Sequence, residues 1–235
     1  MYYTMKKVLF IALVILTVSS CKNDVENTMF VKGKIKGFKK GTLYLQKQVD
    51  SLILSVDSLT VNGRNDFLLK DIIESPEIYY LTLKNSDKRI VFFGEKDTIV
   101  INTVLDKFEI KAEITGSENQ NILSDYNELK RRFNDQNLEL IKEEFEAKKS
   151  GDQDSIRLVE GKKMKLLKRR YLVTINYAIN NSDYEVAPYI ALTEIYDANI
   201  KMLDTINNSL TPEVKESKYG LLLQEYVDER KAQGE

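Results

Sequence analysis

The residue with the clearest chemical role is Cys21, the only cysteine among the 235 residues of the chain. The segment before it, Val18–Ser20, consists of a branched aliphatic residue and two small ones, the pattern at which lipoprotein signal peptidase cuts. Further upstream, the positive pair Lys6–Lys7 precedes an apolar run, Val8–Val18. Positive charge, an apolar run and small residues are the three parts of an export signal. The N-terminus therefore predicts a lipoprotein precursor.

We expect residues 1–20 to be a signal peptide, and residues 21–27 to be a lipidated tether. The apolar run has 11 residues, whereas a membrane-spanning helix needs about 20, so a permanent transmembrane anchor is the weaker interpretation. The alternative for Cys21 is a free or disulfide-bonded thiol, but one cysteine cannot form an internal disulfide. Each buried lipid methylene adds about 0.8 kcal/mol, so two or three acyl chains suffice as an anchor. The expected location is the bacterial envelope, lipid-anchored to the inner or outer membrane and facing the periplasm or the cell surface.

Catalytic and metal-binding residues are scarce. The chain has no histidine, which excludes an imidazole base, a His metal ligand and a Ser-His-Asp relay. No Cys-x-x-Cys, Gly-rich phosphate loop or metal-ligand spacing is present. Carboxylate pairs could do acid–base chemistry, but Asp57 and Asp66 flank a hairpin and are interpreted as turn or edge residues. We expect no catalytic site, cofactor or metal, and the net charge of −1 indicates no nucleic-acid partner.

Residues 28–116 read as short strands, in which β-branched and aromatic residues alternate with polar ones between turn residues. The connections are too short for crossover helices, so the sheet should be mainly antiparallel, in a sandwich or partly open barrel. In Phe30–Lys36 the alternation predicts a strand with one face in solvent, whereas Val91–Phe93 predicts a strand buried on both faces. The expected strands are 30–36, 42–47, 52–61, 66–70, 78–84, 89–93, 98–103 and 108–114.

Residues 117–235 have a helical apolar period, so the whole chain belongs to the α+β class. Gly151 separates a first helix from a second one, which spans about 154–180. The two helices should form an antiparallel hairpin. Glutamates before the turn and lysines and arginines after it would face each other. A third helix is expected from Pro188 to Ala198, because proline suits a first helical position. Thr211-Pro212-Glu213 signals a further helix start, and the last helix should span 217–231.

Two features could bind a partner or ligand. The basic run Lys162–Arg170 could dock anionic lipid headgroups or an acidic protein, although a solvated helix face paired with the preceding acidic helix explains it better. The 13 tyrosines and nine phenylalanines could line a groove for an apolar or sugar ligand. Most of them stand at alternating or helical core positions, which favours packing instead.

The order of several fragments resembles a domain of unknown function that stands N-terminal to thioredoxin-like domains in bacterial lipoprotein thiol-disulfide oxidoreductases. The fragments are Phe30–Ile35, Asp57–Gly63, Pro76–Leu81, Phe92–Ile101, Ile114–Gln120, Ala187–Pro188 and Leu210–Ser217. In that family a redox domain with a cysteine pair follows, whereas here the sequence stops at Gln233-Gly234-Glu235. The resemblance therefore implies a membrane-tethered accessory module and transfers no redox residue to this chain.

These observations lead to three functional expectations. The first is a non-catalytic binding or interaction module, held at the membrane by lipid on Cys21, with an envelope protein as a possible partner. The second is an accessory subunit of a thiol-disulfide redox system, which positions a separate thioredoxin-like protein. The third is a binder of a small molecule or glycan.

Overall fold

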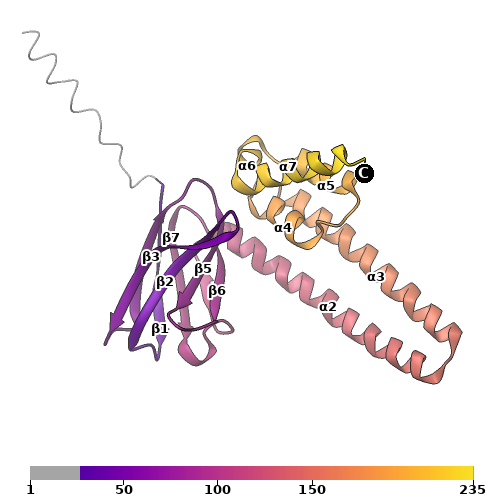
Figure 1. Cartoon of the computed structure of the whole chain (residues 1–235), viewed down its shortest axis with the longest axis horizontal. Helices are drawn as coiled ribbons and strands as arrows, with labels where there is room; N and C mark the ends of the chain where they lie inside the picture. Colours follow the sequence, from indigo (N-terminus) through magenta and orange to yellow (C-terminus); the bar gives the residue numbers. More distant parts are fainter. Residues whose placement is uncertain (1–26, 235) are drawn as a thin grey trace, which may run out of the picture.

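The computed structural model describes residues 27–234, so Cys21 and the expected signal peptide lie outside the described residues. The strands form two four-stranded sheets that face each other, with the order β4-β1-β7-β8 in one and β3-β2-β5-β6 in the other (Figure 1). The strands are β1 (Thr28–Lys36), β2 (Lys40–Val49), β3 (Leu52–Asn62), β4 (Asp66–Ile72), β5 (Glu77–Leu83), β6 (Arg89–Gly94), β7 (Asp97–Val104) and β8 (Glu113–Thr115). The predicted α+β class and the sandwich are confirmed.

Strand pairing is antiparallel except between β1 and β7, which run parallel from Met29 beside Asp97 to Lys36 beside Val104. The prediction of a mainly antiparallel sheet therefore holds, with one exception. No crossover helix is needed for the parallel pair, because the chain crosses to the opposite sheet between β1 and β7 and returns in the same direction.

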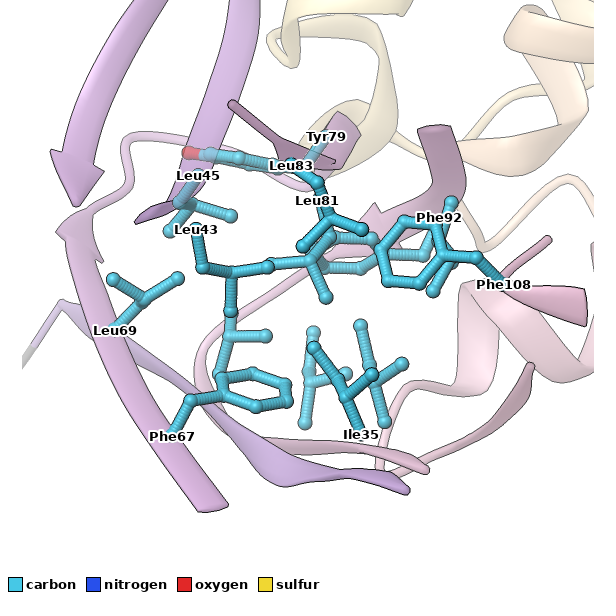
Figure 2. Packing of buried hydrophobic residues seen from close by; sticks show 14 of the residues in the cluster. Ile35, Leu43, Leu45, Phe67, Leu69, Tyr79, Leu81, Leu83, Phe92 and Phe108 are labelled. Carbon is cyan, nitrogen blue, oxygen red and sulfur yellow. The ribbon is translucent and has the colours of Figure 1, made fainter. Parts of the chain in front are cut away.

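The two sheets enclose an apolar core to which every strand except β8 contributes at least one buried side chain (Figure 2). β1 alternates as predicted, with Val31 and Ile35 buried and the lysines between them exposed. Turns at the sheet ends use residues with positive φ, such as Gly63 at +81° after Asn62, and an Asn-Gly pair suits the tight turn of a hairpin. The core thus follows from the period-two pattern of the strands.

Two strand predictions were wrong in detail. The predicted strand 108–114 overlaps β8 only at its last two residues. Phe108 lies in a turn after a short 3-10 helix, η1 (Leu105–Lys107), and fills the core from there. In β6 the strand is not buried on both faces throughout, since Val91 is 43% exposed. Burial of Phe93, on the same face as Val91, requires the helices, which cover only the end of the strand.

The helical part begins directly after β8, and its helices are α2 (Glu118–Ser150), α3 (Gln153–Asn180), α4 (Val186–Glu194), α5 (Ile200–Ser209), α6 (Pro212–Lys215) and α7 (Lys218–Ala232). Ser117 caps α2 by accepting a hydrogen bond from the amide of Gln120, and Gly151 ends it at φ +72°. Thr211 caps α6, whose first residue is proline, as the sequence predicted. The predicted helical hairpin is therefore confirmed as α2 and α3.

The predicted bounds of the helix Pro188–Ala198 were wrong: α4 begins two residues earlier and ends at Glu194. Proline is tolerated at this third helical position, since the first four N–H groups of a helix have no intrahelical partner. The sequence analysis also missed α5, which Asn199 caps by accepting a hydrogen bond from Lys201 N at 3.0 Å. Over residues 27–234 no helix combines the length and the apolar character needed to cross a membrane.

Candidate interaction surface

Aromatic side chains join the sandwich to the helices, in a cluster that we call the junction. At its centre, the Phe93 ring of β6 makes edge contacts with Tyr189 of α4 at 5.6 Å and Tyr219 of α7 at 5.9 Å, between ring centroids. The Tyr219 hydroxyl accepts a hydrogen bond from the amide of Ile78 in β5 at 3.1 Å. Around them lie further apolar and aromatic residues: Ile122, Tyr126, Val186 and Ile190, with Tyr80, Leu123, Leu129, Tyr177 and Tyr184 at the edge. Many of the tyrosines considered as groove residues thus pack two parts of the chain together.

Buried amide side chains complete the junction. The Gln120 carbonyl oxygen accepts from Phe93 N at 2.8 Å, and Asn119 accepts from Val186 N at 2.8 Å. The Asn119 amide nitrogen donates to the carboxylates of Glu95 at 2.8 Å and Glu185 at 2.9 Å. Because buried polar groups are costly unless they are hydrogen-bonded, these contacts fix the orientation of α2 against both β6 and α4.

A cluster of four charges lies where β2, β4, β5 and α7 meet. Lys47 contacts Asp71 at 2.8 Å and Glu77 at 3.4 Å, and Lys218 pairs with the other oxygen of Glu77. The Tyr79 hydroxyl donates to Asp71 at 2.7 Å, and burial, followed by this hydrogen bond, raises the pKa of Tyr79. Burial lowers the pKa of Lys47, but the two carboxylates outweigh it and leave that pKa raised. Both carboxylates are neutralised by lysines, so this arrangement holds elements together rather than supplying a free acid or base.

The sequence analysis did not find this cluster, because its residues come from four elements and each one alone looks like a surface charge. The carboxylates that it did consider are edge residues, as expected. Asp57 accepts hydrogen bonds from the amides of Ser58 and Lys70, and Asp66 pairs with Arg64 at 2.6 Å. Within the described part of the chain, no group of acidic residues could hold a metal ion.

Beyond the junction, α2 and α3 form an arm that projects away from the rest of the molecule to the turn at Gly151 (Figure 1). An α-helix rises 1.5 Å per residue, so the 33 residues of α2 span about 50 Å. Near the start of the arm, Lys130 of α2 forms an ion pair with Glu194 of α4 at 2.7 Å. Further along, the two helices contact only each other, through Phe133, Ala147 and Val159.

The predicted meeting of acidic and basic helix faces occurs along the arm. Lys162 pairs with Glu143 and Lys163 with Glu144, both at 2.6 Å. Lys148 adds a second partner for Glu144 at 2.7 Å, and these hydrogen bonds lower the pKa of Glu144 to about 2. Part of the basic run Lys162–Arg170 is thus engaged in the hairpin itself.

One side of the arm is apolar, and we call it the arm flank: Leu138, Ile141 and Phe145 of α2, with Met164 and Leu167 of α3. The α2 residues follow Asn134 at intervals of four, three and four, which places all of them on one strip of the helix. Leu167 lies on the same side, because it lines a shallow hollow of about 180 Å³ with Asn134. Phe145 is 65% exposed and Leu138 53% exposed. Large apolar side chains gathered on a projecting element indicate a protein interaction site.

A hollow of about 980 Å³ lies where the parallel strands β1 and β7 end. Its walls carry four exposed lysines against two carboxylates, Asp106 and Glu113, together with amide side chains. The lysines are Lys34, Lys36, Lys107 and Lys111. We call this hollow the lysine groove. Its surplus of positive charge would attract an anionic ligand. Its lysines come from β1 and from the segment between β7 and β8, so no local pattern in the sequence indicates the groove.

Comparison with known proteins places the first part of this structure in a family. Residues 29–123 match the family model described as a domain of unknown function, DUF4369. No curated protein and no solved structure matches the chain. The matched segment begins at the first core residue of β1 and ends within α2, so it covers both sheets and the helical turns that enter the junction. The chain therefore carries, at residues 29–123, a domain of unknown function.

Proposed function

We propose that the protein is a non-catalytic interaction module of the bacterial envelope, tethered by lipid on Cys21, and that it holds a partner protein on the arm flank. The observation that carries the proposal is the exposure of five large apolar side chains on a two-helix arm that no other described element covers. Apolar residues spaced three and four positions apart form a strip on a helix surface that can pack against a second helix or into an apolar groove.

The pairing of the carboxylates in the charge cluster supports the non-catalytic part of the proposal. The carboxylates of half-buried Asp71 and buried Glu77 are both engaged by lysines, and the chain has no histidine and no cysteine besides Cys21. Reproducible reduction or oxidation of a disulfide substrate by the pure mature protein would contradict this part.

The test of the arm flank is site-specific photocrosslinking in intact cells. A photoreactive amino acid replaces Ile141, on the arm flank, and in a matched variant replaces Glu146, which is exposed on the opposite side beside Leu158. We expect a discrete adduct from position 141 and none from position 146. Equal labelling from both positions, or no adduct from position 141, would overturn the proposal.

The adduct also decides the redox alternative, in which the module positions a separate thioredoxin-like protein. That alternative is supported by the family resemblance described above. It requires the protein crosslinked at position 141 to carry a reactive cysteine pair, which thiol labelling of the adduct would detect. A crosslinked partner without reactive thiols would contradict the redox alternative and would still agree with the interaction module.

A second candidate function, the binding of a small anionic ligand, is favoured by the lysine groove. A ligand that binds only the folded state stabilises it, so a library of anionic sugars and phosphates should raise the melting temperature. The charge-reversal variant Lys34→Glu/Lys107→Glu should abolish that shift, whereas Lys165→Glu on the arm should leave it intact. If no compound shifts the melting temperature, the second candidate fails.

A further inference from the structure

The β2–β3 hairpin extends beyond its sheet as a two-stranded ribbon. β5 pairs with β2 only from Leu43 to Lys47, whereas the pairing of β2 with β3 continues through Gln48–Ile53 and Val49–Leu52. We call residues 48–54 the ribbon tip. No third strand pairs with it, although Lys218 of α7 donates a hydrogen bond to the Gln48 carbonyl oxygen at 2.8 Å. Each residue of the tip is exposed.

The ribbon tip is apolar on both faces. Successive residues of a strand point to opposite sides, so Ile53 lies on one face, and Leu52 and Leu54 lie on the other. Their side chains are exposed by 46%, 66% and 44%, and Val49 by 39%. A strand with one face in water normally shows polar residues on that face, so an element that is apolar on both faces indicates a surface that something covers.

The ribbon tip lies at the end of the sandwich where the N-terminal tether enters. Lys47, next to the tip, pairs with Asp71 at 2.8 Å. The residue after Asp71 is Ile72, which is 58% exposed and lies opposite Thr28, the first residue of β1. The ribbon tip therefore lies at the end of the sandwich at which the chain arrives from Cys21. Ile72 lies at the same end, but its side chain points to the opposite face of β4 from Asp71.

The length of the tether limits how far this end can be from a membrane. Thr28 follows Cys21 by seven positions, and a fully extended chain spans at most about 3.5 Å per residue, or about 25 Å here. A lipid on Cys21 thus holds this end of the sandwich near the bilayer, and the lysine groove, at the other end of β1, away from it.

We infer that the ribbon tip inserts its apolar side chains into the bilayer that holds the lipid anchor, so that the protein docks on the membrane in a defined orientation. This inference rests on the lipid anchor proposed above. The only charged residue of the tip is Asp50, in the turn. Insertion is consequently driven by apolar burial, and it requires neither anionic lipid nor low salt.

The test measures immersion depth with a nitroxide spin label on the full-length, lipidated protein in phosphatidylcholine vesicles. Because acylation uses up the only native thiol, Ile53→Cys offers a single labelling site. Asp87→Cys is the matched control, since residue 87 is exposed in the β5–β6 turn at the other end of the sheet. Oxygen partitions into lipid and a nickel chelate stays in water, so their relaxation effects report depth.

We expect the label at position 53 to be accessible to oxygen and protected from nickel, at low and at high salt, and the label at position 87 to behave as in water. If the protein is acylated and the label at position 53 is as accessible to nickel as the label at position 87, membrane insertion is contradicted, whereas the lipid anchor is not. Missing acyl mass in the same sample would overturn the anchor and the inference together. Spectral broadening at position 53 that disappears on dilution with unlabelled protein would show pairing between two copies instead of insertion.

Discussion

The junction and the arm use the same two helices in opposite ways. Near the sandwich, α2 and α3 bury Ile122, Tyr126 and Thr174, and the Tyr126 hydroxyl contacts that of Thr174 at 3.0 Å. Along the arm, the helices are held by a few apolar residues and by ion pairs on their surface, and large side chains such as Phe145 remain exposed. Stability is therefore concentrated at the junction, whereas the arm leaves apolar surface exposed.

The difference follows from desolvation. Removing apolar area from water stabilises by about 25 cal/mol per Å², whereas an exposed ion pair contributes about 0 to 1 kcal/mol. Substitutions at the junction should therefore lower the stability of the whole fold, and substitutions on the arm should change binding and leave stability almost unchanged.

The largest expected effect is that of Phe93→Ala. The Phe93 ring is fully buried between α4 and α7, and removing it leaves a cavity, so we expect a loss of about 3 to 5 kcal/mol in the free energy of unfolding. Phe145→Ala on the arm flank is the matched control and should change stability by less than about 0.5 kcal/mol. Urea unfolding followed by circular dichroism measures both. Similar losses in the two variants would mean that the arm is as stabilising as the junction.

Next in size is the effect of Glu77→Gln in the charge cluster. The neutral amide leaves Lys47 and Lys218 partly buried without their shared carboxylate, which should cost about 1 to 3 kcal/mol. The control is Glu139→Gln, whose partner Lys142 is exposed three residues away on the same helix. That variant should unfold at nearly the wild-type urea concentration. An equally mild effect of Glu77→Gln would show that the cluster does not fasten α7 to the sandwich.

Local patterns in the sequence predicted much of this fold. The alternation in Phe30–Lys36 depends only on neighbouring residues, and the structure confirms the strand and its buried face. The same is true of the cap at Thr211-Pro212 and of the turn at Gly151. Helix α5 was missed because its stripe of buried residues covers only ten residues and follows no proline or glycine signal.

The junction and the candidate surfaces could not be predicted in the same way. Tyr219 meets Ile78 across 141 positions of the chain, and no local pattern indicates that contact. The exposure of Phe145 was equally hidden, because an apolar residue on a helix is expected to be buried until the neighbouring elements are known. The ribbon tip became visible only when the register showed where β5 stops covering β2.

A third prediction uses alkaline pH against the junction. Burial raises the pKa of Tyr126 from its ordinary 10.0 to about 12, although the hydrogen bond with Thr174 opposes this. The folded state then keeps a proton that the unfolded state loses above pH 10, so stability is complete below pH 10 and falls as the pH rises towards 12. One pKa unit corresponds to about 1.4 kcal/mol, which gives a loss of about 2 kcal/mol from this residue by pH 12. Urea unfolding at pH 9 and pH 11.5 should reveal a smaller decline in Tyr126→Phe than in the wild type, and identical declines would contradict the assignment.

The smallest effect belongs to the arm and appears at the opposite end of the pH scale. Hydrogen bonds from Lys148 and Lys163 lower the pKa of Glu144 from its ordinary 4.5 to about 2, so its contribution is present above pH 4.5 and is lost as the pH falls towards 2. A carbon-13 NMR titration of the Glu144 carboxyl group should therefore give a midpoint near 2, and Lys163→Met should raise it. A midpoint near 4.5 in the wild type would mean that water screens these surface pairs completely. In that case only the buried side chains Phe133, Ala147 and Val159 hold the two helices of the arm together. The arm and the junction would then differ only in how much apolar area each buries.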